Sequence, residues 1–164
     1  LFMGGEFGQF IEWNEWQALD WHLLEYTSHQ SMQQFLKELN SVYKTYPSFY
    51  ELDTTYDGYN WIEVDNSDES VISFERIDRG GNKIIAAFNF TPISRDAHPI
   101  GVDKPGTYEV ILNTSDHRFG GNDTTVVTEY KTLIEKSFNR PYTLRIQLHG
   151  LSGVFIKYKE DNVK

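Results

Sequence analysis

The second half of the chain contains a series of short segments that are rich in β-branched and aromatic residues. Such residues favour the extended backbone of a β-strand, and the Gly, Asn, Asp and Pro clusters between the segments supply tight turns. Seven or eight short strands with this punctuation predict an antiparallel β-sandwich or barrel. The expected strands are residues 61–64, 71–74, 83–90, 108–112, 124–130, 142–148 and 154–158, and the expected turns are residues 66–68, 79–82, 103–106 and 119–122.

Residues 28–46 carry the pattern of one amphipathic helix. Apolar residues recur there at three- and four-residue spacing, which places them on one helical face. Ser28 or Ser31 can cap its start, and Pro47 ends it because a proline disfavours the helical conformation of the preceding residue. The four Trp lie at or before position 61 and the five Pro at or after position 47. We therefore place a domain boundary near Asp53.

Composition limits the classes of function. A chain of 164 residues with 39% hydrophobic residues can bury a real core. No apolar run approaches the roughly 20 residues that span a bilayer, and a net charge of -9 opposes binding to a phosphate backbone. The absence of Cys fits a reducing compartment. We expect a cytoplasmic protein that binds neither nucleic acid nor membrane.

The N-terminal run LFMGGEFGQFIEWNEW has the composition of a site-forming loop. Its apolar triplet runs into a Gly-rich turn, which is typical of a buried strand that leads into a loop. Trp faces stack on sugar rings, and Glu, Asn and Gln side chains hydrogen-bond hydroxyl groups, so this mixture suits a polyhydroxylated ligand. The run begins without Met, and we expect the chain to be a piece of a larger protein.

Several motifs of the chain resemble those of a known family. The segments GGEFGQ at residues 4–9, EWNE at 12–15 and LDW at 19–21 are similar to the glycogen branching enzymes, the 1,4-α-glucan branching enzymes of the α-amylase superfamily. More matching segments follow in the same order, so the resemblance covers nearly the whole chain. They are LNSVY at 39–43, YDGYNWI at 56–62, SVISF at 70–74, FNFTP at 88–92, GTY at 106–108 and GG at 120–121.

The resemblance implies an architecture for the parent protein: an N-terminal β-sandwich, a central (β/α)8 barrel and a C-terminal antiparallel β domain. Residues 1–52 would be the end of the barrel, with residues 1–4 as its last strand, residues 5–27 as a long loop and residues 28–46 as the last helix. Residues 53–164 would be the C-terminal β-sandwich. The expected fold is thus mainly β, an antiparallel β-sandwich preceded by the last strand, loop and helix of the barrel.

The resemblance also implies an activity for the parent. A branching enzyme cleaves an α-1,4 bond and transfers the released segment to a 6-hydroxyl, which forms an α-1,6 branch with retention of the anomer. In this family the catalytic carboxylates lie on earlier barrel strands, so no catalytic residue is expected in this chain, which should be inactive alone. No metal or organic cofactor is needed. The expected partners are α-1,4-glucan or glycogen and the rest of the parent chain.

Four residues of the N-terminal run are expected to contact substrate: Glu6, Gln9, Trp13 and Asn14. Their loop would leave a barrel strand at its C-terminal end, where enzymes with this fold place their chemistry. Trp13 would stack on a glucose ring, while Gln9 and Asn14 would bond hydroxyl groups. Trp16 and Trp21 could also stack on glucose rings. The alternative for all three Trp is core packing, and the alternative for Glu6 is a structural carboxylate that accepts N–H bonds from the loop.

Other interpretations stay open. Glu12 and Glu15 have the spacing of a carboxylate pair on one helical turn, but retaining glycosidase pairs normally face each other from separate strands. Tyr56, Tyr59 and Trp61 fit either a surface glucan site or a cluster at the domain junction. The five His lack metal-ligand spacing, so no metal site is expected. The rival functions are a stand-alone carbohydrate-binding β-sandwich with a docked helix, and a related hydrolase or debranching enzyme.

Overall fold

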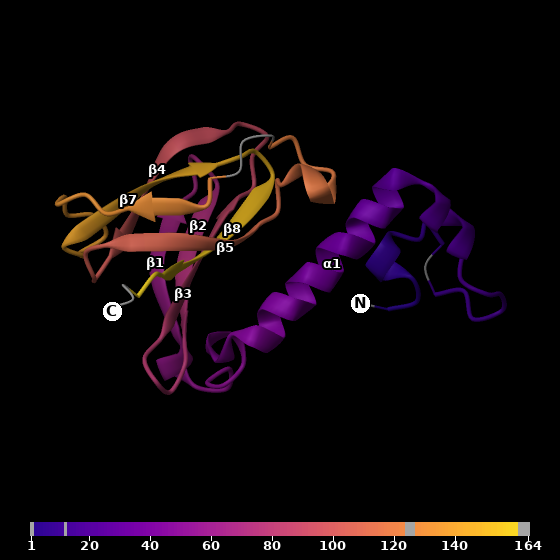
Figure 1. Cartoon of the computed structure of the whole chain (residues 1–164), viewed down its shortest axis with the longest axis horizontal. Coiled ribbons are helices and arrows are strands. Elements are labelled where there is room, and N and C mark those ends of the chain that lie inside the picture. The colour runs from indigo at the N-terminus through magenta and orange to yellow at the C-terminus, as the bar shows by residue number, and fades with distance from the viewer. Residues whose placement is uncertain (1, 12, 124–126, 161–164) are drawn as a thin grey trace.

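The computed structural model describes residues 2–11, 13–123 and 127–160. A long helix, α1 (Thr27–Thr45), extends from a two-layered β-structure, and the N-terminal segment folds back against its far end (Figure 1). The short 3-10 helices are η1 (Gly5–Phe7), η2 (Trp21–Glu25), η3 (Pro47–Phe49), η4 (Tyr56–Gly58) and η5 (His117–Phe119). The strands are β1 (Tyr59–Asn66), β2 (Val71–Ile77), β3 (Lys83–Asn89), β4 (Arg95–Val102), β5 (Thr107–Asn113), β6 (Glu129–Lys131), β7 (Tyr142–Leu148) and β8 (Ser152–Tyr158).

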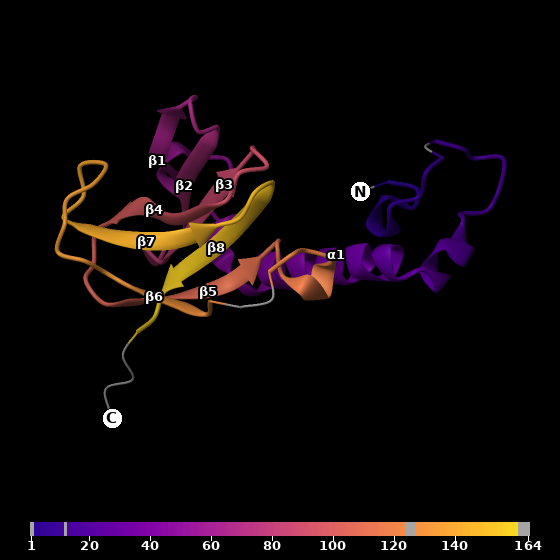
Figure 2. The same cartoon turned by 90° about the horizontal axis from the view of Figure 1, so that it is seen from above.

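The strands of the described residues form two sheets. The larger has the order β1-β2-β3-β8-β5-β6, and the smaller consists of β4 and β7. Every strand pair is antiparallel. The smaller sheet lies over one face of the larger one (Figure 2). The prediction of a mainly β, antiparallel sandwich is therefore confirmed.

An apolar core fills the space between the two sheets. Successive residues of a strand face opposite sides, so alternate side chains of the larger sheet meet those of β4 and β7. Burial of one large apolar side chain contributes about 1.5–3 kcal/mol, and this layer is the main source of stability for the sandwich. The core residues are Ile62, Val71, Ile85, Ala87, Ile100, Val102, Tyr108, Leu144, Ile146, Leu148, Val154 and Ile156.

The opposite face of the larger sheet carries aromatic rings that join it to the end of α1. Phe88 of β3 lies 6.0 Å from Phe74 and 5.7 Å from Phe155, measured between ring centroids. Phe49 of η3 lies 5.7 Å from Phe155. Gly153 pairs with Phe88 in register, and a Cβ there would lie 2.5 Å from the ring. Only glycine lets this ring lie across β8.

The helix predicted at residues 28–46 is confirmed, with its observed ends shifted by one residue. Its predicted cap is wrong: the residue that precedes the helix is Tyr26, and no side chain caps the helix start. Ser28 and Ser31 lie inside the helix. The chain enters the helix from η2, so the first turn begins where that short helix ends and not at the first serine.

The sequence pattern does not predict β4. Its sequence, RDAHPIGV, is interrupted by charged residues and by Pro99, which cannot donate to a strand ladder. Among the described residues β4 is hydrogen-bonded to β7 alone, so Pro99 lies on an edge strand, where a missing N–H is tolerated. The imidazole of His98 also lies 2.8 Å from the buried carboxylate of Glu63, which ties β4 to β1. Of the strand predicted at residues 124–130, residues 124–126 lie outside the described residues and β6 covers the end.

The barrel strand expected at residues 1–4 is not formed in the described part of the chain, and Leu1 lies outside it. Met3 and Gly4 adopt a turn, with φ of 45° and 88°, and the N–H of Gly5 bonds to the carbonyl of Phe2 at 3.2 Å. A strand of a closed barrel is hydrogen-bonded to a neighbouring strand on each side. None is present beside this segment among the described residues, so a turn forms instead.

A buried ion pair closes one end of the core. Arg140 donates two hydrogen bonds to the carboxylate of Glu75, one of them at 3.0 Å. Lys83 lies 3.2 Å from the same carboxylate. A Cβ on Gly101 would lie 2.4 Å from the carbonyl oxygen of Ser137 and 3.3 Å from the Arg140 side chain. Glycine at position 101 therefore lets the segment before β7 approach β4 and bring Arg140 to β2.

Replacement of Arg140 by Leu should lower the free energy of unfolding by about 3 kcal/mol, because it leaves the buried Glu75 carboxylate without its main partner. Urea denaturation measures the effect. The double variant Glu75→Leu/Arg140→Leu removes both charges and should recover most of the loss. A single variant as stable as the wild type would show that this ion pair does not hold the end of the core.

Candidate functional site

The four residues that the sequence assigns to substrate binding lie in the segment before α1. The helix η1 is flanked by Gly4 and Gly8, with φ of 88° and 70°, a conformation that glycine adopts without strain. Phe7 is fully buried, and its ring lies 5.1 Å from that of Trp21. The carbonyl oxygen of Phe7 is 2.7 Å from Nδ1 of His29 on α1. These contacts fix the segment to the helix.

Gln9 takes part in the structure of the loop itself. Its Oε1 accepts a hydrogen bond from the N–H of Asp20 at 2.8 Å, and its Nε2 donates to the carbonyl of Ile11 at 2.9 Å. A Cβ on Gly4 would lie 2.9 Å from Cβ of Gln9. The Gln9 side chain therefore joins the two ends of the loop, and one N–H and one lone pair of its amide are left for another partner.

Trp13 points away from the core of this chain. Its side chain is 72% exposed, and its ring centroid lies 4.8 Å from that of Phe2. Its φ of 59° places it in the left-handed region, which is unusual for a bulky residue and costs on the order of 1 kcal/mol or more. Within this chain the core-packing alternative for Trp13 does not apply.

Glu6 and Asn14 differ in their surroundings. Oδ1 of Asn14 accepts a hydrogen bond from the N–H of Trp16 at 3.2 Å, which forms a local turn. The carboxylate of half-buried Glu6 forms no hydrogen bond or ion pair with any residue that the structure describes. Glu6 therefore does not serve there as an acceptor for the N–H groups of the loop.

Two further exposed aromatic side chains belong to the same loop. Trp16 is 89% exposed and Phe10 is 77% exposed. The set of expected substrate contacts contains neither of them. The ring of Phe10 lies 5.3 Å from the imidazole of His29, measured between centroids. The signal that points to both side chains is the recurrence of large aromatic residues in a polar loop.

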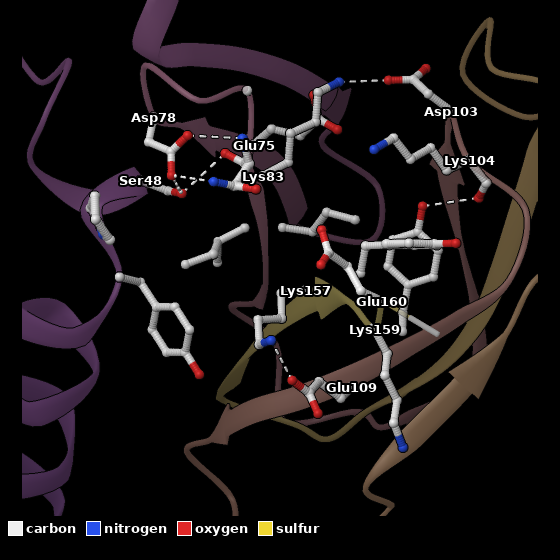
Figure 3. Close-up of a pocket in the computed structure, with 18 residues that line it drawn as sticks. Ser48, Glu75, Asp78, Lys83, Asp103, Lys104, Glu109, Lys157, Lys159 and Glu160 are labelled. Carbon is white, nitrogen blue, oxygen red and sulfur yellow. Dashed lines mark hydrogen bonds and ion pairs between the residues drawn. The ribbon is translucent and has the colours of Figure 1, made fainter. Parts of the chain in front are cut away.

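A cleft of about 650 Å³ lies where the end of α1 and η3 meet strands β3, β5 and β8 (Figure 3). In it, Lys83 pairs with Asp103 at 2.6 Å, and Lys157 pairs with Glu109 at 2.5 Å. Burial alone would lower the pKa of Lys83, but hydrogen bonds to Asp103 and Glu75 raise it overall. Burial alone would raise the pKa of Asp103, but the hydrogen bond from Lys83 lowers it overall. The pair is therefore charged across the neutral range.

Tyrosine rings form much of the rest of the cleft. Burial raises the pKa of Tyr108 to about 12, so its hydroxyl stays protonated and donates to the carbonyl of Lys104 at 3.0 Å. The ammonium of Lys104 lies 5.4 Å from the ring centroid of Tyr158, and that of Lys157 lies 5.8 Å from the ring centroid of Tyr46. The sequence did not indicate this cleft, because its residues come from distant segments.

The residues that the structure describes offer neither a membrane helix nor a cluster of ligands. No described helix is both long and apolar enough to cross a bilayer. No three His, Asp or Glu side chains in the described ranges come together in an arrangement that could hold a metal ion.

Comparison with known families and proteins identifies proteins that are similar to this chain. Residues 61–159 match the family model of the α-amylase C-terminal all-beta domain. The 1,4-alpha-glucan branching enzyme GlgB of Vibrio parahaemolyticus is 39% identical over 156 residues, which cover 95% of this chain and 21% of that protein. GlgB of Aquifex aeolicus is 38% identical over 160 residues, which cover 97% of this chain and 25% of that protein. The chain thus spans about a fifth to a quarter of the length of these relatives.

Solved structures share the fold at low sequence identity. The Group B Streptococcus pullulanase SAP has a TM-score of 0.54 at 17% identity and covers 87% of this chain, while this chain covers 18% of it. The catalytic module of the pneumococcal protein SpuA has a TM-score of 0.54 at 11% identity, with 90% of this chain and 21% of that chain covered. Likeness at these identities shows a common fold and nothing about activity.

The free energy of unfolding should depend on pH through the ionisation of the Asp103 carboxylate. Its lowered pKa means that the carboxylate stabilises the folded chain fully above its unfolded pKa of about 4 and that the contribution is lost as the pH falls through the folded pKa. The difference in free energy of unfolding between the wild type and Asp103→Asn should be constant near neutral pH and shrink as the pH falls below about 4. Urea titrations over a pH series measure it, and a difference independent of pH would contradict the pairing with Lys83.

Proposed function

The chain belongs to the family of α-amylase C-terminal all-beta domains, and from this premise we propose that it is the C-terminal part of a glycogen branching enzyme. The observation that carries the proposal is the length of this chain over which its relatives are similar to it. Relatives with that name are 38–39% identical over 95–97% of the chain, which includes the N-terminal segment and α1 as well as the sandwich. We assign residues 1–52 to the end of the catalytic barrel and residues 53–164 to the C-terminal domain.

The proposed parent enzyme cleaves an α-1,4-glucan and transfers the released segment to a 6-hydroxyl to form an α-1,6 branch. A retaining mechanism needs a carboxylate nucleophile and a carboxylic acid about 5–5.5 Å apart on either side of the scissile bond. Glu6 has no second carboxylate among its described contacts. We therefore infer that the catalytic pair lies in the part of the parent that corresponds to the rest of the relatives' length.

In this proposal the N-terminal loop supplies substrate contacts. Trp13 presents an exposed ring on which a glucose unit can stack. Glu6 has a carboxylate free to accept bonds from sugar hydroxyls, and Asn14 adds an amide. Gln9 contributes mainly by holding the loop in shape through Asp20. The proposed glucan contacts are thus Glu6, Gln9, Trp13 and Asn14, with Gln9 in a supporting role.

The two rival functions receive less support. A stand-alone carbohydrate-binding β-sandwich would leave unexplained why the similarity to branching enzymes continues through α1 and the loop before it. A hydrolase or debranching enzyme shares the fold, as the pullulanase shows, but the identity there is only 17%. The proposal includes a cytoplasmic location and glucan as the substrate, which agree with the absence of Cys and the net charge of -9.

The purified 164-residue chain should neither hydrolyse nor branch amylose, because substrate contacts alone cannot form a covalent glycosyl intermediate. Iodine staining of amylose and analysis of α-1,6 linkages measure this. The full-length parent serves as the positive control. New α-1,6 linkages made by the chain alone would contradict the placement of the catalytic carboxylates outside it.

In the parent enzyme, Trp13→Ala should lower kcat/KM about ten- to thirtyfold through the loss of one stacking ring, which corresponds to about 1–2 kcal/mol. The thermal midpoint should change little, because the ring is exposed. Phe90→Ala is the matched control, since this aromatic side chain is 60% exposed and lies outside the loop, just after β3. An unchanged rate with a sharply lowered midpoint would instead make Trp13 a packing residue in the parent.

A further inference from the structure

We propose that the cleft between the end of α1 and the sandwich is a second binding site for neutral α-1,4-glucan chains, in addition to the N-terminal loop. The identity of the sugar rests on the proposed function, whereas the site rests on the geometry of the cleft. Its volume of about 650 Å³ falls within the roughly 300–1,000 Å³ of sites that bind small molecules.

The cleft has sides that come from different parts of the chain. Figure 3 shows Ser48 and Asp78 on one side, Asp103 and Lys104 on the opposite side, and Lys157 across the space below them. Aromatic and aliphatic side chains lie between these polar groups. An apolar surface with a few converging polar groups is the usual composition of a binding site for a small organic ligand.

Two tyrosines give the cleft rings on which a sugar can lie. Tyr46 and Tyr158 are both partly exposed, and neither hydroxyl forms a hydrogen bond within the described ranges of the chain. The Tyr158 ring is held in place by Tyr108, at 5.3 Å between centroids, and by Gly106, where a Cβ would lie 3.1 Å from the ring. A fixed ring with a free hydroxyl suits a glucose unit, which has an apolar face and hydroxyls at its rim.

The charges of the cleft favour a neutral ligand over an anion. Lys83 and Lys157 are each held within 2.6 Å of a carboxylate, Asp103 and Glu109 respectively. A phosphate would compete with these carboxylates and be repelled by them. A sugar hydroxyl can accept a bond from an ammonium and donate one to the carboxylate beside it, so each pair offers both kinds of group without a net charge.

Hydrogen bonds fix the shape of the side of the cleft that contains Ser48 and Asp78. The hydroxyl of Ser48 in η3 donates to the carbonyl of Asn82 at 3.0 Å, and the N–H of Arg79 donates to the carboxylate of Glu51 at 2.9 Å. These bonds tie the segment after α1 to the turn between β2 and β3. A glucan chain bound here and at the N-terminal loop would be held at two points, which raises its effective concentration at each.

The test is an NMR titration of the isotopically labelled 164-residue chain with maltoheptaose. Amide signals of residues around the cleft, such as Lys83, Lys104 and Tyr158, should shift in a saturable manner. Tyr46→Ala should raise the Kd for these shifts about three- to tenfold through the loss of one ring. Lys104→Ala should also raise it, and because this side chain is exposed the variant is expected to fold as the wild type does. The control Trp13→Ala should leave the Kd of the cleft unchanged.

Three outcomes overturn the inference: no shift around the cleft with maltoheptaose, equal Kd values in the wild type and both cleft variants, or larger shifts with inorganic phosphate than with the sugar. The branching assay of the parent separates this result from the proposed function. A parent that forms α-1,6 linkages while the cleft binds no maltoheptaose refutes the cleft site alone. A parent that forms none refutes the proposed function, whatever the cleft binds.

Discussion

The packing of the small sheet on the large one is the constraint on which the rest of the structure depends. Strands β4 and β7 are far apart in the sequence and form a two-stranded sheet in the described part of the chain, with one further bridge from Thr143 of β7 to Leu133. A two-stranded sheet is at best marginally stable alone. Residues such as Ile100 and Leu144 are fully buried because the larger sheet covers them. Burial of this apolar layer therefore stabilises both the core and the pairing of β4 with β7.

Buried polar groups fix how the two sheets are placed on one another. The apolar layer has little directional preference, whereas the bonds from Arg140 to Glu75 and the contact between His98 and Glu63 require particular positions. Each of these pairs joins the larger sheet to the smaller sheet or to the segment beside it. Such pairs add little net stability compared with apolar packing, and their main effect here is to define one arrangement of the sheets.

The sandwich in turn positions the proposed glucan-binding loop through α1. The C-terminal end of the helix is joined to the larger sheet by Phe49 and Phe155, and the N-terminal end holds the loop through His29 and Phe7. The sandwich can thus influence the proposed substrate contacts by setting the direction of one helix. The cleft beside that helix lies at the joint, where a bound glucan would contact both parts.

The sequence by itself determined the elements that depend on neighbouring residues: the helix before Pro47, most of the strands and the turns between them. It also indicated a polar, aromatic loop, although not that Trp16 is more exposed than Trp13 or that Gln9 is bonded to Asp20. Only the tertiary structure decided that the segment with Pro99 becomes a strand and that Tyr46 and Tyr158 share a cleft. The physical reason is that propensity and turn chemistry act over a few residues, whereas burial and pairing depend on residues brought together from distant parts of the chain.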